Sequence, residues 1–299
     1  MSRLRTRLWL WCLIVTLLAP VTARADLSQS NARKLIRTMG GWSLPSSAVR
    51  IQSFRSNGAD AAEASAEIQA VFRLRLREGR WGLREIRAGQ DRWERLDVIA
   101  RAAGAELPQS ECDAPAQFTN IKSPSQLTNK RARCLVAGLL GVQQPSDDVR
   151  IREVSLFGLS LGAESSALVT ALIQVDFRFV REARRWRVAE FKSGNRDWVS
   201  VAGIPAAMNQ IKRTEAAEEL STIAKALGDF RRDRGYFVVS KSESVLIDHL
   251  SPKYLARVIR IDPWHRPYHY EGRQDRYSLR SAGPDGKPHT ADDVVVSGP

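Results

Sequence analysis

An internal duplication is the feature that most constrains how this 299-residue chain can fold. The segment from Arg33, RKLIRTMGGWSLPSSAVRI, is similar to the segment from Arg133, RCLVAGLLGVQQPSDDVRI. A second block from Ile68, IQAVFRLRLREGRWGLREIRAGQDRW, is similar to IQVDFRFVREARRWRVAEFKSGNRDW from Ile173. The offset is 100 residues in the first block and 105 in the second. Self-similarity of this kind marks a repeated structural unit, so we expect one fold to occur twice.

Each copy carries the same predicted order of elements. In the first copy, NARKLIRTMGGW places apolar side chains at helical spacing and ends in glycines. AVRIQSF follows as a strand, EIQAVFRLRLREG alternates as a half-buried antiparallel strand does, and RWGLREIRAG returns as a third strand. The predicted fold class is α+β. Two tandem helix-plus-antiparallel-sheet repeats have the element order of cystatin-like or NTF2-like units.

The first 25 residues have the composition of a secretory signal peptide. Three arginines precede the apolar run LWLWCLIVTLLA, and TARA supplies small residues for cleavage after Ala25. We therefore expect a periplasmic or secreted protein with no membrane-spanning segment after cleavage. The predicted organisation continues with repeat 1 at 26–105, a linker at 106–130, repeat 2 at 131–210 and a C-terminal domain at 211–299.

Two cysteines, Cys112 and Cys134, remain after the predicted cleavage. An even number in an exported protein favours a structural disulfide. Two free thiols stay the alternative, because a sequence gives no distances.

The basic charge is moderate. Removing the four arginines of residues 1–25 lowers the net charge from +13 to +9. This favours an arginine-rich solvated surface over a site for nucleic acid or an anionic polymer. The repeats contain paired tryptophans, which we expect to be core residues rather than a ligand-stacking surface. They are Trp81, Trp93, Trp186 and Trp198.

The C-terminal residues carry a recognisable pattern. An amphipathic helix is predicted from an N-cap at Thr214 to a stop at Gly235, and PYHYEG with DRYSLRSAG indicates a hairpin. The stretches ALGDFRRDRGYF, IDPWHRPYHY and YSLRSAGPDGKPHTADD resemble the C-terminal periplasmic domain of the major pseudopilin of the type II secretion system. The resemblance implies a helix followed by a small antiparallel sheet. The long apolar helix and leader that begin a pseudopilin have no counterpart before this helix.

The loop SAGPDGKPHTADD, residues 281–293, gathers three aspartates in a basic chain. The resemblance implies one structural calcium ion, with Asp285, Asp292 and Asp293 as carboxylate ligands and a backbone carbonyl such as that of Ala282 completing the shell. Calcium prefers such oxygen ligands, and close carboxylates repel one another without a cation. A solvated acidic turn is the alternative. Prolines on both sides of His265 exclude a helical zinc pair with His269.

These observations favour a non-enzymatic exported protein. We expect an accessory or interaction protein of the cell envelope, with a protein partner that belongs to a type II secretion or pilus-like system, and no nucleic acid as partner. The alternative is a small-ligand binder or enzyme that uses a pocket in the tandem repeats. The four paired tryptophans would then line that pocket.

Overall fold

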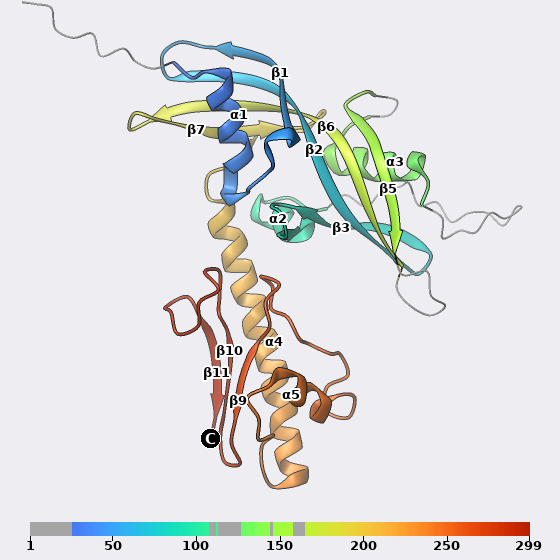
Figure 1. Cartoon of the computed structure of the whole chain (residues 1–299), viewed down its shortest axis with the longest axis vertical. Helices are drawn as coiled ribbons and strands as arrows, with labels where there is room; N and C mark the ends of the chain where they lie inside the picture. Colours follow the sequence, from blue (N-terminus) through green and yellow to red (C-terminus); the bar gives the residue numbers. More distant parts are fainter. Residues whose placement is uncertain (1–25, 108–111, 113–126, 144–145, 158–164) are drawn as a thin grey trace, which may run out of the picture.

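The structure is a computed structural model that describes residues 26–107, 112, 127–143, 146–157 and 165–299. The predicted signal peptide and most of the predicted linker lie outside these residues. Figure 1 shows two lobes that follow one another along the long axis. The first lobe, here called the repeat body, contains both repeats. Helix α4 (Ile204–Arg234) runs from it into the C-terminal lobe.

One antiparallel sheet contains both repeats. Its centre is a pair of 17-residue strands, β2 (Ala61–Arg77) and β6 (Ser166–Glu182). On the side away from the central pair, each long strand pairs with two shorter strands. The shorter strand that precedes it in the sequence pairs with one half of it, and the shorter strand that follows it pairs with the other half. These are β1 (Val49–Ser56) and β3 (Arg80–Arg87) on β2, and β5 (Val149–Phe157) and β7 (Arg185–Lys192) on β6. Two short strands, β4 (Trp93–Arg95) and β8 (Val199–Ser200), lie at the edges.

The register of the central pair shows how the repeats are related. Ile68 of β2 lies opposite Ile173 of β6, and these are equivalent residues of the two copies. In an antiparallel pair of equivalent strands, a residue opposite its own equivalent marks a local two-fold axis. The duplication therefore produced one continuous sheet with the axis at this pair. The predicted helix and three main strands are confirmed in each repeat.

Helices cover one face of this sheet (Figure 1). They are α1 (Gln29–Thr38) of repeat 1, the short α2 (Leu96–Ala102) that follows it, and α3 (Asn129–Leu140) of repeat 2. Ile36 of α1 and Val136 of α3 are buried at equivalent places, and both belong to one hydrophobic core with residues of β2 and β6. The two repeats thus share a core as well as a sheet. Burial of apolar surface on this scale is the main stabilising force in a domain.

Cys112 and Cys134 form a disulfide, with Cα atoms 5.9 Å apart. The bridge ties the segment before α3 to that helix, and the expected structural role is consistent with this position. Replacing both cysteines by serine should lower the free energy of unfolding by about 3 kcal/mol, because the bridge closes a loop in the unfolded chain. Urea denaturation of the oxidised protein and of the double variant measures this difference. Equal midpoints would contradict it.

The C-terminal lobe packs a small sheet and a short helix against α4. The sheet has the order β11 (Val294–Gly298), β10 (Tyr277–Ser281), β9 (His269–Gly272), and the helix is α5 (Glu243–Leu250). The predicted hairpin is confirmed as β9 and β10. The core of this lobe is separate from that of the repeat body and includes Leu220, Leu227 and Tyr270.

The predicted start of the long helix is wrong, whereas its predicted end is confirmed. Helix α4 begins at Ile204, after a left-handed Gly203 and with proline in its first turn. Thr214 lies inside the helix, and its hydroxyl donates to the carbonyl of Gln210. The sequence hid these turns because their buried side chains face the repeat body instead of continuing the apolar stripe. Gly235 ends the helix with φ of 85°.

Among the described helices, none combines the length and the apolar composition needed to cross a membrane.

Candidate functional site

The C-terminal loop is held by a buried carboxylate, that of Asp262. One oxygen of Asp262 accepts the backbone N–H groups of Trp264 and Arg266, both at 2.9 Å. The other accepts the hydroxyl of Ser281 at 2.5 Å. Asp262 is only 3% exposed, and hydrogen bonds satisfy the charge that its burial would otherwise leave costly. The aspartate of IDPW thus fixes its own turn to the end of β10, where the acidic loop begins.

Arg266 connects this turn to the acidic loop. Its guanidinium donates to the carbonyl oxygens of Gly283 at 2.6 Å and Pro284 at 3.3 Å. Gly286 has φ of 69°, and a Cβ atom there would overlap that guanidinium. Only glycine meets both demands at this position. The start of the loop is therefore fixed by neighbours that the sequence pattern alone did not single out.

Five oxygen atoms meet at the centre of the loop. The hydroxyl oxygen of Thr290 lies 2.6 Å from an oxygen of Asp292 and 3.0 Å from the carbonyl oxygen of Lys287. It also lies 3.4 Å from one carboxylate oxygen each of Asp285 and Asp293. A hydroxyl has one proton and can donate it to one acceptor. The Asp285 oxygen also accepts the backbone N–H of Lys287 at 2.8 Å, so donors within the loop satisfy part of this cluster. Oxygen atoms of these types are the ligands that a hard cation prefers.

The two adjacent aspartates differ in their partners. Asp293 has a side chain only 4% exposed, is ion-paired with Arg280, and accepts the N–H of His289 at 2.7 Å. Burial alone would raise the pKa of Asp293, but Arg280 and the hydrogen bonds bring it below its ordinary value. The pKa of Asp292 is also lowered, first by the hydroxyl of Thr290 and then by the backbone N–H of Asp285. Both aspartates are therefore ionised at neutral pH.

The predicted calcium ligands lie together in one loop, but their oxygen atoms are directed to different partners. Ala282 is buried, and its carbonyl oxygen accepts the N–H of Gly286 at 3.1 Å. No three His, Cys, Asp or Glu side chains within the described residues are placed to hold one metal ion together. Asp293 directs one oxygen to Arg280, so the oxygen cluster relies on Thr290 and Lys287 in addition to the aspartates. Sequence reasoning missed Thr290, although a threonine two residues before an aspartate pair is a visible oxygen donor.

A buried ion pair joins the C-terminal lobe to the repeat body. The ammonium group of Lys212, on α4, lies 2.5 Å from Glu94 of β4, and the two side chains are 4% and 2% exposed. The other oxygen of Glu94 accepts from Arg92 at 2.7 and 2.9 Å. Such a pair is stable only while both charges are present. Near this junction, Trp264 binds α4 itself through a hydrogen bond from its indole N–H to Asn209 at 3.1 Å.

His265 lies at this junction rather than in a metal site. Its Nε2 atom is 3.5 Å from Glu85 of β3, and its φ is 65°. Burial lowers the pKa of His265, and nearby Lys212 opposes the charged form, although Glu85 acts in the other direction. The imidazole is therefore neutral at pH 7. The second histidine of the excluded zinc pair, His269, is on β9.

A comparison with known protein families shows what the C-terminal lobe is similar to. Residues 204–297 match the family model of the type II secretion system (T2SS), protein G. The match begins at the first residue of α4 and ends in β11, so it covers the long helix, the acidic loop and the small sheet. It spans just under a third of the chain. No curated protein and no solved structure matches the chain. The predicted resemblance is confirmed, and we call residues 204–297 the protein G module.

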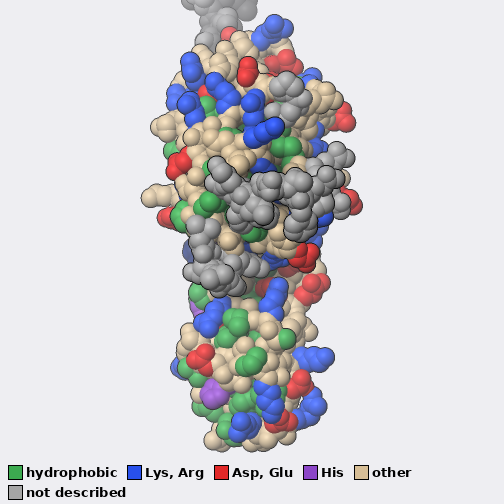
Figure 2. All heavy atoms as spheres, turned by 90° about the vertical axis from the view of Figure 1, so that its right-hand side faces the viewer, with side chains coloured by type: hydrophobic (Ala, Val, Ile, Leu, Met, Phe, Trp, Pro, Cys, Tyr) green, Lys and Arg blue, Asp and Glu red, His purple; other side chains and the backbone are tan. Residues whose placement is uncertain are grey.

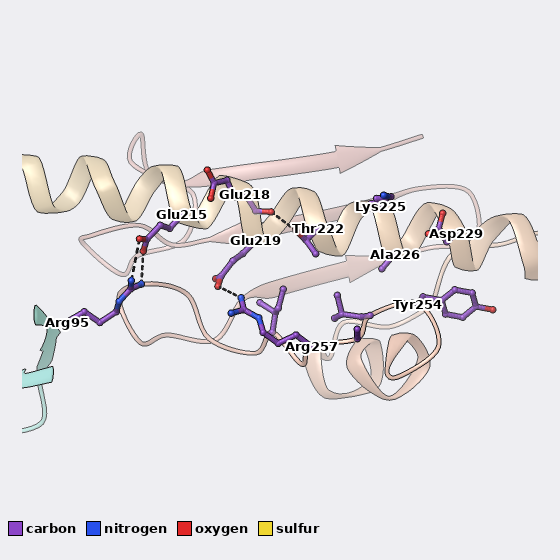
Figure 3. A pocket seen from close by; sticks show the side chains of 13 residues that line it. Arg95, Glu215, Glu218, Glu219, Thr222, Lys225, Ala226, Asp229, Tyr254 and Arg257 are labelled. Carbon is purple, nitrogen blue, oxygen red and sulfur yellow. Dashed lines mark hydrogen bonds and ion pairs between the residues drawn. The ribbon is translucent and has the colours of Figure 1, made fainter. Parts of the chain in front are cut away.

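A polar groove of about 710 Å³ runs along α4 in the protein G module (Figure 3). One wall is α4, and the other is the loop around Tyr254 and Arg257. Arg95, from the repeat body, closes one end by an ion pair to Glu215 at 2.7 Å. Arg257 pairs with Glu219 at 3.0 Å.

Carboxylates dominate the helix side of this groove. Four of them lie on α4 at spacings that place them on one face, with Lys225 among them. They are Glu215, Glu218, Glu219 and Asp229. Glu219 also accepts the hydroxyl of Tyr268 at 2.7 Å, and burial together with this carboxylate raises the pKa of Tyr268. No basic side chain among the described residues pairs with Glu218. Glu215, Glu219 and Asp229 are ion-paired within the chain, so Glu218 is the carboxylate of this set that is left for a basic partner.

The paired tryptophans of the repeats have two different environments. Trp81 is 1% exposed and lies in the core, as expected. Trp93 and Trp198 are half-buried, with the guanidinium groups of Arg73 and Arg178 over their rings at 4.1 and 3.9 Å. Such cation–π contacts are worth about 0.5–1 kcal/mol at exposed sites. The repeat body contains an apolar cavity that is lined by Trp42 and by residues of both repeats. None of the four paired tryptophans lines this cavity.

Proposed function

We propose that this chain is an exported, non-enzymatic accessory protein of the cell envelope. Its protein G module docks on a type II secretion or pilus-like assembly, and its repeat body is carried by that module. The observation that supports this proposal most directly is the family match over the whole module, from the first residue of α4. The sequence of residues 1–25 supports export.

The beginning of α4 supports an accessory role over that of a filament subunit. In the family that the C-terminal lobe resembles, a long apolar helix precedes this module. Here α4 leaves the repeat body just after β8, and Met208 and Lys212 on its first turns are buried against that body. The surface of α4 near its start is thus already occupied within the chain. The protein G module is therefore presented as an attached domain.

The groove along α4 is the surface that we assign to the partner. It combines acidic side chains on α4 with an aromatic ring and aliphatic groups on the facing loop. Interfaces with such mixed composition are typical of transient complexes. The partner surface would carry lysine or arginine opposite Glu218. Lys and Arg side chains are spread over both lobes on the face in Figure 2, interspersed with acids, which gives no support for one basic nucleic-acid site there.

We also propose that one calcium ion stabilises the acidic loop. Asp285 and Asp292 would supply carboxylate oxygens, and Asp293 would supply the oxygen that faces Thr290. The hydroxyl of Thr290 and the carbonyl of Lys287 or Ala282 would complete the shell. The bound ion neutralises the converging carboxylates and holds β10 and β11 together across the loop. Its role is structural: because the ion binds the folded module and not the unfolded chain, its binding stabilises the fold.

Site-specific photocrosslinking in the envelope of the producing cell tests the docking proposal. A benzophenone amino acid replaces Thr222, which is exposed in the groove. The matched control carries it at Arg152, which is exposed on β5 of the repeat body. We expect the Thr222 probe to crosslink a secretion or pilus component, and the control not to do so. Crosslinks to such a component from Arg152 alone would contradict the assignment of the groove.

A further inference from the structure

The repeat body contains an apolar cavity, partly open to solvent, on its local two-fold axis. The cavity has a volume of about 270 Å³, and Ile68 and Ile173, the pair that marks the axis, both line it. Helices α1, α2, α3 and the first turns of α4 all contribute to its wall. The largest apolar groups of the lining are Trp42, Phe72, Phe177 and Phe191. The volume lies just below the roughly 300–1,000 Å³ range of small-molecule sites.

Water is a poor occupant of this space. A buried water molecule needs two to four polar partners, and most of the lining is aliphatic or aromatic. Protein interiors otherwise contain few voids larger than a water molecule. An apolar ligand suits the walls better, since it removes its own surface from water as it enters.

One end of the cavity is polar. Ser193 and Arg196 lie there, beside the last turn of α3. The hydroxyl of Ser193 donates to the carbonyl of Leu140 at 3.0 Å, and one terminal nitrogen of Arg196 donates to that of Gly138 at 3.2 Å. The Nε atom of Arg196 is buried and has no hydrogen-bond partner within the described part of the chain. A buried donor without a partner is uncommon and costly.

The side chain of Arg196 is held firmly in this place. Gly141, with φ of 67°, has no Cβ atom, and one built there would lie 2.7 Å from the Arg196 Cγ atom and 3.0 Å from its Nε atom. The stem of Arg196 therefore packs where any other residue at position 141 would collide. Arg196 is half-buried, and the acidic group of the lining, Glu106, is exposed and forms no ion pair with it among the described residues. A second arginine of the lining, Arg87, also has a buried Nε atom without a hydrogen-bond partner among the described residues. Its guanidinium lies over the ring of Trp93, which is outside the cavity.

We infer that this cavity binds a linear apolar molecule that ends in a carboxylate, with the carboxylate accepting the free N–H of Arg196. The chain of the ligand lies along the axis between Ile68 and Ile173. A carboxylate forms a stronger bond to a guanidinium than a neutral oxygen does, so the charged end selects among apolar ligands. This site is independent of the groove and of the acidic loop in the protein G module.

Titration calorimetry with decanoate tests the inference, with decanol as the uncharged probe. We expect decanoate to bind at one site per chain, and Arg196→Met to weaken its binding about tenfold or more while leaving decanol unchanged. Arg84→Met, at an exposed arginine of β3, is the matched control. Equal binding of decanoate to the wild type and to Arg196→Met would overturn the role of Arg196.

A second pair of variants tests the cavity itself. Ala100 of α2 lines it, whereas Ala102 of the same helix does not. Ala100→Leu should abolish decanoate binding by filling the space, and Ala102→Leu should not. Bromodecanoate should quench part of the tryptophan fluorescence, and this part should be lost in Trp42→Phe. Absence of decanoate binding to the wild-type protein, or unchanged binding to Ala100→Leu, would overturn the proposed site.

Discussion

Replacing Glu94 by alanine is expected to lower the free energy of unfolding by about 3–5 kcal/mol. The substitution leaves the Lys212 side chain, which is 4% exposed, without the carboxylate that lies 2.5 Å from its ammonium group. A buried charge that loses its partner cannot recover its hydration. Chemical denaturation followed by circular dichroism measures the loss. The effect should be large because the pair is buried where the two lobes meet, so an unpaired charge there also weakens their junction.

Two further variants test whether the loss of stability comes from the unpaired charge of Lys212. The double variant Glu94→Leu with Lys212→Leu removes both charges and should recover most of the lost stability, since apolar replacements of buried ion pairs are often neutral. Glu215→Ala removes the more exposed ion pairs to Arg95 and Arg101. It should cost less than about 1 kcal/mol, as exposed pairs usually do. A cost for Glu215→Ala that equals that of Glu94→Ala would contradict the distinction.

The fold of each repeat could be predicted from the sequence, but not the way in which the repeats join. Alternation along β2 and β6 predicts half-buried strands, and the tandem copies predict equal elements. The pairing of Ile68 with Ile173 requires the free edge of β2 in one repeat to meet the free edge of β6 in the other, and no local sequence pattern encodes that contact. The buried lysine is a similar case. Lys212 has no sequence feature that distinguishes it from an exposed lysine of a long helix.

The acidic loop was located from the sequence, while its internal organisation was not. The family pattern pointed to Asp285, Asp292 and Asp293 together. It did not show that Asp293 pairs with Arg280, because an arginine on the preceding strand also suits a solvated surface. The roles of Asp262 and Arg266 depend on hydrogen bonds between segments about twenty residues apart. Those bonds exist only in the folded module.

Calcium is expected to stabilise the protein G module by about 4 kcal/mol when its free concentration is a thousand times the dissociation constant. The ion would replace the repulsion among the oxygens around Thr290 with attraction. Magnesium should stabilise the module much less, because it demands a smaller octahedral shell and gives up its water reluctantly. Asp292→Asn removes a negative charge from the cluster while keeping its shape. Asp275→Asn is the matched control, at an exposed aspartate between β9 and β10 of the same lobe.

The most direct test of a calcium-stabilised protein G module is the melting midpoint of the protein lacking residues 1–25, measured in calcium and in excess EGTA. We expect calcium to raise the midpoint of the C-terminal lobe by at least about 8 °C in the wild type and in Asp275→Asn. We expect little or no rise in Asp292→Asn. Equal midpoints of the wild-type protein in calcium and in EGTA would contradict the account and would leave the three aspartates as a solvated turn.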